Sequence, residues 1–305
     1  MNKPTFKAKV MQVQVPASTA NVGPGFDSVG LALSMHDRYV AQVLDEVTLD
    51  IDITGEGADD LPRNDKNLLV KAMYKGFDAL GGRPKGLAIR ALNVNPHGRG
   101  LGSSASAIVG GLVLARSLVL NGEDKLSDEA LLSLATDMEG HPDNVSASLF
   151  GGATISWVDN AKKAHSLRIA VDPRIQAIAY IPSTSLATSK ARKMLPTSIP
   201  FDEAVLNTRN AALLGHALGS RPDLLLLATE DYLHQKYRAD AMPQSFALVE
   251  KLRSAGVAAF ISGAGPTVLA LHSLTGSEFE ELKTVAGSHF QATPLEIAPR
   301  GAILL

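Results

Sequence analysis

Alternating apolar and polar residues predict several strands in the first hundred residues. The stretch 7–15 alternates, and we expect Pro16 to end it because proline cannot donate to a strand ladder. The stretches 31–44 and 47–53 also have strand patterns. Only two residues separate them, so we expect a hairpin whose turn lies between them. A further strand is expected over 87–94.

Apolar residues at helical spacing predict three helices before residue 140. Over 67–80 they recur every three or four positions, and a Gly-Gly pair follows. The apolar run 105–120 predicts a buried helix that ends at an Asn-Gly pair. A third helix is expected over 127–139, where Ser127 is a suitable cap and two acidic residues occupy the first turn.

The second half of the chain mixes strands and helices. After a strand over 151–158, we expect strands over 176–181, 257–262, 267–271 and 294–297, helices over 201–218, 222–232, 243–255 and 277–290, and one helical turn near Arg192. This order predicts an α+β fold in which helices cover one face of an antiparallel sheet. The polar stretch 159–163 is expected to be the seam between two domains, 1–163 and 164–305.

Composition narrows the class of protein. The chain has 305 residues, a formal net charge of -2 and no cysteine. The charge does not indicate a nucleic-acid or membrane partner, and the missing thiols exclude disulfides and thiolate metal sites. The polar N-terminal residues do not have the pattern of a signal peptide, and charged and glycine residues interrupt the longest apolar run. We therefore expect a cytoplasmic location.

A glycine-rich stretch precedes the longest apolar run. Gly98, Gly100 and Gly102 lie where the expected helix begins, and a helix N-terminus offers free backbone N–H groups and partial positive charge. This arrangement favours a phosphate group. Ser103 and Ser104 offer hydroxyl donors or a metal ligand, and Arg99 would add a cation. The stretch is neither a Walker A sequence nor the G-x-G-x-x-G fingerprint, and by itself it is equally compatible with a simple tight turn.

Three stretches together resemble the GHMP kinases, and most closely the homoserine kinases among them. They are PHGRGLGSSA from Pro96, VPASTANVGPGFDSVGLAL from Val15, and SGAGPTVLAL from Ser262. The resemblance implies an N-terminal domain like ribosomal protein S5 domain 2, a ferredoxin-like C-terminal domain, and a site between them. It further implies transfer of phosphate from ATP, with Mg²⁺, to the hydroxyl of L-homoserine in threonine biosynthesis.

The resemblance also implies residues for the nucleotide and its metal. The nucleotide would contact Asn67, Pro96, His97, Gly98, Arg99, Gly100, Leu101, Gly102, Ser103, Ser104 and Ala105. Ser104 and Glu139 would hold Mg²⁺, which prefers oxygen ligands and keeps several waters. Without the resemblance, Glu139 could simply be solvated and Asn67 could be a helix cap.

For the acceptor, the resemblance implies a site with both signs of charge. Homoserine has an ammonium group, which Asp27 would bind. It also has a carboxylate, which Arg192 and Arg238 would bind through bidentate hydrogen bonds. The full set of acceptor residues is Asn21, Asp27, His141, Asn144, Thr188, Arg192, Arg238 and Gly263. The segment DYLHQKYR, from Asp231 to Arg238, favours homoserine over mevalonate, which lacks an ammonium group.

The catalytic step is less closely defined by sequence. The candidate residues are Asn144, Asp143 and Arg192, and Asp143 could be either a catalytic base or the cap of the following helix.

Two other functions stay open: a GHMP kinase for a different small alcohol, and an inactive relative that senses a ligand. The sequence does not decide the oligomeric state, and a homodimer stays open.

Overall fold

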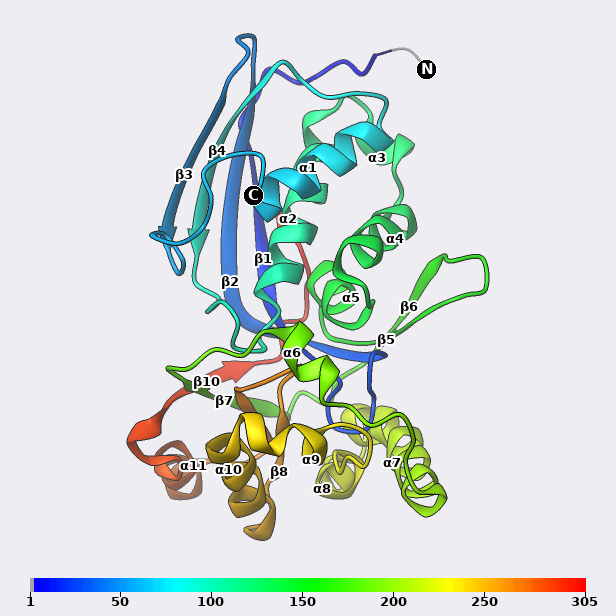
Figure 1. Ribbon diagram of the computed structural model, residues 1–305, viewed down its shortest axis with the longest axis vertical. Helices are drawn as coiled ribbons and strands as arrows, with labels where there is room; N and C mark the ends of the chain where they lie inside the picture. Colours follow the sequence, from blue (N-terminus) through cyan, green and yellow to red (C-terminus); the bar gives the residue numbers. More distant parts are fainter. Residues whose placement is uncertain (1–2) are drawn as a thin grey trace.

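The structure is a computed structural model that describes residues 3–305. It consists of two bodies stacked along the long axis of the molecule (Figure 1). The upper body contains strands β1 (Met11–Ala20), β2 (Val29–Leu44), β3 (Leu49–Gly55), β4 (Gly86–Asn93), β5 (Ala153–Val158), β6 (Ala164–Ile169) and β11 (Ile303–Leu304). Its helices are α1 (Leu68–Ala79), α2 (Ser103–Leu118), α3 (Gly122–Lys125), α4 (Asp128–Glu139) and α5 (Asp143–Phe150).

The upper sheet corrects the expected hairpin. Its strand order is β11-β1-β2-β4-β3, with β5 paired to β2 and β6 paired to β5. Strand β4 therefore lies between β2 and β3, and β3 runs parallel to β4. Parallel neighbours need a long crossover, and α1 supplies it. Alternation correctly identified β2, β3 and β4, but it carries no information about which strand is the partner, and β6 and β11 were not predicted from the sequence.

The expected end of the first strand was also wrong. Strand β1 continues through Pro16 to Ala20, and its pairing with β2 shifts register between Pro16 and Ala17. Proline is tolerated at such an irregularity because the ladder is already interrupted there. The consequence is functional, because the additional residues carry β1 down to the junction between the two bodies (Figure 1).

Helices cover one face of the upper sheet and bury its core (Figure 1). The expected cap at Ser127 is confirmed, because its side chain accepts a hydrogen bond from the Ala130 N–H. Asn67, for which a cap was the alternative to a nucleotide contact, also caps its helix by accepting from the Leu69 N–H. Large buried side chains of this core include Met73, Phe77, Leu87, Ile89, Ile108, Leu112 and Leu114. Helix α2 packs against both α1 and β1, so the core fixes the position of its N-terminus.

The lower body has an antiparallel sheet with the order β10-β7-β9-β8. Its strands are β7 (Gln176–Pro182), β8 (Ala258–Ile261), β9 (Val268–His272) and β10 (Phe290–Glu296). The helices are α6 (Thr188–Lys193), α7 (Phe201–Gly219), α8 (Leu225–Ala228), α9 (Gln235–Arg238), α10 (Pro243–Ser254) and α11 (Gly276–Thr284), with short 3-10 turns at η1 (Pro222–Leu224), η2 (Ala239–Ala241) and η3 (Gly287–His289). The expected helical turn near Arg192 is confirmed as α6.

Helices pack on both faces of the lower sheet, not on one. Ile178 and Tyr180 of β7 face the cluster built by α10 and α11. Ala177 and Ala179, which alternate with them, face α7 and α8 together with residues of β1 and β2. The α+β class is confirmed, and the second covered face joins the lower sheet to the upper body.

Two expected helices of the lower body are shorter than the apolar pattern suggested. The helix expected over 222–232 ends at Ala228, and the Asp231 carboxylate then accepts three successive backbone N–H groups in a turn. The helix expected over 277–290 ends at Thr284, and β10 already begins at Phe290. Polar groups that compete for the backbone are common reasons for such early helix ends.

The division into 1–163 and 164–305 stays a prediction. The first strand after that boundary, β6, pairs with β5 in the upper sheet, so the chain changes sheet between Ile169 and Gln176. It returns at β11, which pairs with β1. Within residues 3–305, the structure contains no helix whose length and apolarity would allow it to cross a membrane.

Candidate active site

The glycine-rich stretch forms a tight loop at the start of α2. Gly98, Gly100 and Gly102 all have positive φ angles, of 66°, 81° and 70°. A Cβ atom on Gly100 would lie 2.3 Å from the Ser262 carbonyl oxygen, and one on Gly102 would lie 2.1 Å from Ser18 Oγ. The loop therefore needs glycine for both conformation and space. We call residues 96–102 the phosphate loop, because they present the N-terminus of a four-turn helix to the space between the two bodies.

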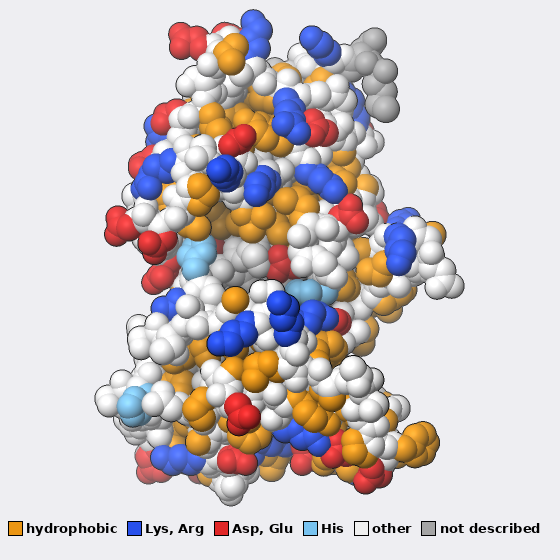
Figure 2. Space-filling model, in the orientation of Figure 1, with side chains coloured by type: hydrophobic (Ala, Val, Ile, Leu, Met, Phe, Trp, Pro, Cys, Tyr) orange, Lys and Arg blue, Asp and Glu red, His pale blue; other side chains and the backbone are white. Residues whose placement is uncertain are grey.

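A cavity of about 210 Å³, here called the main cavity, lies at this helix end between the two bodies. Space-filling side chains show a hollow at the waist of the molecule, with histidine, acidic and basic groups around it (Figure 2). The expected site residues that line it are Asn21, Asp27, Gly98, Gly100, Gly102, Ser103, Ser104, Glu139, His141, Asp143, Asn144, Thr188, Arg192, Arg238 and Gly263. Residues from distant parts of the sequence therefore line the same cavity.

A smaller pocket of about 130 Å³, here called the side pocket, shares Ser103 and Ser104 with the main cavity. Its walls are mostly apolar and include Ile53, Leu61, Leu68, Leu69, Ala91 and Ala107, with Tyr39, Asn67, Asn93 and His97. The Asn67 amide is engaged locally, because it accepts from Leu69 and donates to the Pro62 carbonyl. Asn67 therefore serves as a helix cap, and it also contributes to the wall of this pocket.

Four expected nucleotide residues line neither space. Leu101 and Ala105 are buried in the protein core. Pro96 and Arg99 line a separate groove on the other side of the loop. The Arg99 guanidinium donates to the carbonyl oxygens of His97, Pro182 and Ser183. Arg99 therefore points toward the lower body in this structure, and not along the helix N-terminus.

Two oxygen atoms on facing helices meet at the edge of the main cavity. Ser104 Oγ, in the first turn of α2, donates to Glu139 Oε1 at 2.6 Å. Burial raises the pKa of Glu139, and the hydrogen bond from Ser104 opposes that rise. Adjacent ligands of an octahedral Mg²⁺ ion lie about 2.9 Å apart, so a hydroxyl and a carboxylate at this separation fit the requirements of that ion.

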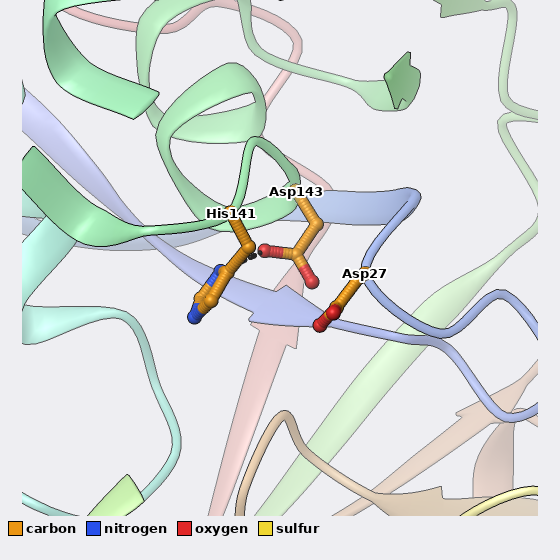
Figure 3. Close-up of side chains that lie close together, drawn as sticks. All are labelled: Asp27, His141 and Asp143. Atoms are coloured by element: carbon orange, nitrogen blue, oxygen red, sulfur yellow. Dashed lines mark hydrogen bonds and ion pairs between the residues drawn. The ribbon is translucent and has the colours of Figure 1, made fainter. Parts of the chain in front are cut away.

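Asp27, His141 and Asp143 form a second polar group in the cavity and point toward one another (Figure 3). Their nearest ligand atoms all lie within 4.8 Å of one another, and His141 Nδ1 lies 2.7 Å from Asp143 Oδ1. Burial alone lowers the pKa of His141, but the hydrogen bond and charge of Asp143, followed by the charges of Glu139 and Asp27, outweigh burial and raise it to about 9. His141 is therefore a cation at neutral pH.

Asp143 and Asn144 begin helix α5 and are both nearly inaccessible to solvent. The same Asp143 oxygen that meets His141 also accepts the Asn144 backbone N–H, at 2.7 Å. The Asn144 side-chain oxygen accepts a hydrogen bond from Ser18 Oγ at 3.0 Å. Ser18 belongs to the part of β1 beyond Pro16, so the unexpected extension of that strand orients Asn144.

The loop that follows β1 carries Asp27 in an unusual backbone conformation. Asn21, Val22 and Asp27 all have positive φ angles, of 68°, 47° and 55°. The Asn21 side chain holds the loop, because it donates to the Gly263 carbonyl at 2.9 Å and accepts the Asp27 N–H at 3.0 Å. Non-glycine residues in this region are costly and are usually kept by surrounding contacts at functional sites.

Both expected acceptor arginines flank the ring of Phe26. The Arg192 guanidinium lies 5.4 Å from the ring centroid and that of Arg238 lies 5.6 Å from it. Arg192 binds the Asp27 carboxylate through two hydrogen bonds, of 2.7 and 3.0 Å. The two residues expected to bind opposite ends of the acceptor therefore pair with each other in this structure.

Arg238 is only 3% exposed and is held by a histidine that sequence reasoning did not single out. His234 Nε2 donates to the Gly23 carbonyl, which leaves His234 Nδ1 as an acceptor for Arg238 at 3.2 Å. Arg238 also donates to the carbonyl oxygens of Gly263 and Ala191. Burial, followed by the charge of Arg192, lowers the pKa of Arg238, which nevertheless stays positively charged in a protein.

Sequence reasoning also missed Asp37, which is 2% exposed. Its carboxylate accepts hydrogen bonds from Tyr39, Ser106 and the backbone N–H groups of Val94 and Asn95. It thereby fixes the chain just before the phosphate loop to β2 and α2. The signal was present, because Asp37 lies on the inward face of an alternating strand, where a carboxylate needs dedicated partners.

Comparisons with known proteins agree with this geometry. The chain matches the family described as "GHMP kinases N terminal domain" over residues 67–152 and "GHMP kinases C terminal" over 204–285. It is 49% identical to the homoserine kinase of Streptomyces coelicolor, over all of this chain and 97% of that protein. It is 48% identical to the homoserine kinase of Streptomyces avermitilis, over 100% of this chain and 99% of that one.

Solved structures show the same fold. A crystal structure of homoserine kinase from Cytophaga hutchinsonii superimposes with a TM-score of 0.83 at 24% identity, over 100% of both chains. A putative homoserine kinase from Listeria monocytogenes gives a TM-score of 0.75 at 27% identity, over 97% of this chain and 99% of that one. The two-domain fold, the converging site and the full-length sequence identity lead to one conclusion. The chain belongs to the homoserine kinase family of the GHMP kinases.

Proposed function

We propose that this kinase transfers the γ-phosphoryl group of ATP to the hydroxyl of L-homoserine, and that the main cavity is where the transfer takes place. The observation that carries the proposal is that the main cavity brings together two kinds of binding group. A helix N-terminus with a glycine loop lies at one end, and Asp27, Arg192 and Arg238 lie at the other. Such a site suits a triphosphate and a small zwitterion at the same time.

The nucleotide is assigned to the helix end and the side pocket. The adenine ring suits the apolar walls that Leu68, Leu69 and Ile53 provide, and the phosphates suit the N–H groups of the phosphate loop. Ser103 and Ser104 lie where the two spaces join, so the triphosphate would pass them. Phosphoryl transfer depends mainly on positioning and on neutralising charge, which this arrangement provides.

Ser104 and Glu139 would hold Mg²⁺. A bound Mg²⁺ ion neutralises phosphate charge and orients the β- and γ-phosphates. The fit rests on the hydroxyl and carboxylate oxygens, which lie 2.6 Å apart at the cavity edge. Burial raises the pKa of Glu139 and so disfavours its ionised form. A cation bound beside the carboxylate would oppose this effect, because a nearby positive charge favours the ionised form.

Homoserine is assigned to the opposite end, with its ammonium group on Asp27 and its carboxylate on Arg192 and Arg238. In the transfer step the acceptor oxygen forms a bond to the γ-phosphorus, and the bond from that phosphorus to the bridging oxygen of ADP breaks with its electron pair going to ADP. The proton of the acceptor hydroxyl passes to a non-bridging oxygen of the transferred phosphoryl group. Asn144 and Asp143 line the same cavity, and Asn144 would orient the acceptor hydroxyl. Because Asp143 is already bonded to the His141 cation, we assign it to orienting His141 and not to accepting the proton.

The direct test is release of ADP from Mg·ATP in a coupled assay with L-homoserine, mevalonate, galactose and L-serine as separate acceptors. We expect turnover with L-homoserine alone. Turnover with mevalonate or galactose would remove the acceptor assignment but keep the nucleotide site. Nucleotide binding without turnover on any acceptor would instead support a sensor that has lost catalysis.

Two accompanying assignments stay predictions. A homodimer is tested by light scattering of the purified protein at several concentrations. A cytoplasmic location is tested by fractionating cells that produce the protein and assaying each fraction.

A further inference from the structure

The carbonyl side of the phosphate loop faces the lower body. The Gly98 oxygen accepts the Leu186 N–H at 2.9 Å, and the Arg99 oxygen accepts the Thr267 N–H at 3.2 Å. The Gly100 oxygen accepts a hydrogen bond from Ser262 Oγ at 2.6 Å. Three successive carbonyl groups of the loop are therefore held by the lower body, which leaves the opposite side of the loop for a nucleotide.

The Arg99 side chain strengthens this connection. Its Nε donates to the Pro182 oxygen at 3.2 Å, and its two Nη atoms donate to the oxygens of Ser183, at 2.7 Å, and of His97, at 2.5 Å. One planar guanidinium thus binds carbonyl groups on both sides of the junction. A guanidinium matches this arrangement because its donors have a fixed, forked geometry.

The segment that Arg99 binds leads directly to the acceptor end of the cavity. Strand β7 ends at Pro182, and Ser183 follows it. Helix α6 begins five residues after Ser183, at Thr188, and carries Arg192. Helix α6 is short and has no side-chain cap. Arg238 donates to its Ala191 carbonyl, and its Arg192 pairs with Asp27. At its N-terminal end, the position of the helix depends on how the preceding residues are held.

We infer that Arg99 is a positioning residue that fixes the phosphate loop to the 182–192 segment and so keeps the nucleotide and acceptor halves of the site in register. This inference rests on the proposed function. Arg99 lines neither the main cavity nor the side pocket among the described residues, so it acts through the segments that it joins. It is not a ligand of the nucleotide phosphates.

The test compares Arg99→Met and Arg99→Lys with the wild-type protein. Binding of L-homoserine to the nucleotide-free protein is measured by calorimetry, and KM values for ATP and L-homoserine are measured separately. We expect Arg99→Met to weaken homoserine binding about tenfold even without nucleotide, equivalent to about 1.4 kcal/mol, and to raise both KM values. Lysine keeps the charge but cannot reach three carbonyl groups in one plane. Homoserine binding and both KM values of Arg99→Lys should therefore be close to those of Arg99→Met.

The matched control is Arg90→Met, which removes an exposed arginine of β4 that pairs with Asp50 on the surface. It should leave homoserine binding and both KM values unchanged. Melting temperatures of all variants establish that they are folded.

Two results would overturn the inference. If Arg99→Met raises only the KM for ATP and Arg99→Lys restores it, then Arg99 contacts phosphate through its charge. If Arg99→Met leaves homoserine binding and both KM values unchanged, then the contact has no role in positioning. Failure of the proposed function is a different result, because in that case the wild-type protein itself would not phosphorylate L-homoserine.

Discussion

The Asp27 carboxylate and the Arg192 guanidinium pair through two hydrogen bonds, of 2.7 and 3.0 Å, across the acceptor end of the cavity. Their side chains are 35% and 45% exposed, and an ion pair so accessible to water is worth about 1 kcal/mol or less. A single hydrogen bond to a charged group in a buried site is worth about 1.5–3 kcal/mol. A zwitterion that gives each residue a new partner can therefore separate the pair at little cost.

Asp27→Asn should weaken selection for an acceptor with an ammonium group. The substitution removes the only charge assigned to that group, so we expect the KM for L-homoserine to rise about tenfold or more. The preference for L-homoserine over 4-hydroxybutanoate, which lacks the amino group, should fall. Steady-state kinetics with both acceptors measure this. Asp59→Asn, at an exposed loop position, is the control and should change neither value.

Arg238→Ala should weaken binding of the acceptor and leave binding of the nucleotide unchanged. The guanidinium is buried beside Gly263 and is assigned to the homoserine carboxylate, so the KM for L-homoserine should rise roughly tenfold or more. The KM for ATP should stay within about twofold. Kinetics on Arg221→Ala, an exposed arginine paired with Asp223, supply the comparison. A shift in the ATP value alone would reverse the assignment of the two ends.

Glu139→Gln should increase the Mg²⁺ concentration needed for activity and lower kcat. An amide is a weaker ligand than a carboxylate, and we expect the half-maximal Mg²⁺ concentration to rise roughly tenfold. A magnesium titration at saturating substrates measures the effect. Glu129→Gln, in the exposed first turn of the same helix, should behave like the wild type. An unchanged titration curve for Glu139→Gln would remove it from the metal site.

The pKa of His141 predicts a pH-dependent contribution to stability. Folding raises this pKa from 6.5 to about 9, so the folded state binds the proton more tightly than the unfolded state. The stabilisation is complete below about pH 6.5 and is lost as the pH rises through about 9. Urea unfolding of ligand-free wild type and His141→Gln should therefore show a difference in free energy at pH 6 that shrinks by pH 10. A constant difference over this range would contradict the raised pKa.

Sequence patterns predicted the elements of this fold better than their connections. The cap at Ser127 was predicted correctly, and a cap was one of the two roles considered for Asn67, because caps depend only on neighbouring residues. The hairpin between β2 and β3 was wrong because strand partners are chosen by the whole sheet. Pro16 did not end β1, because an irregularity in the pairing accommodates it there.

The same distinction holds for the site. The residue types pointed to phosphate, a divalent cation and an acceptor of both charges, and the structure places most of those residues around the main cavity, with Asn67 and His97 in the side pocket. Their contacts with one another were not predictable. The pairing of Arg192 with Asp27 and the direction of Arg99 depend on how two bodies meet. The burial of Asp37 was readable from alternation, but its partners lie on other elements.

The pairing of β11 with β1 has a consequence for how the molecule is made. Residues 303–304 complete the sheet that begins at residue 11, although the whole lower body lies between them in sequence. During synthesis on the ribosome, the lower body has emerged before this last strand is available. The upper sheet can therefore be completed only late in synthesis. Until β11 pairs with β1, residues 13 and 14 of β1 form an unpaired strand edge.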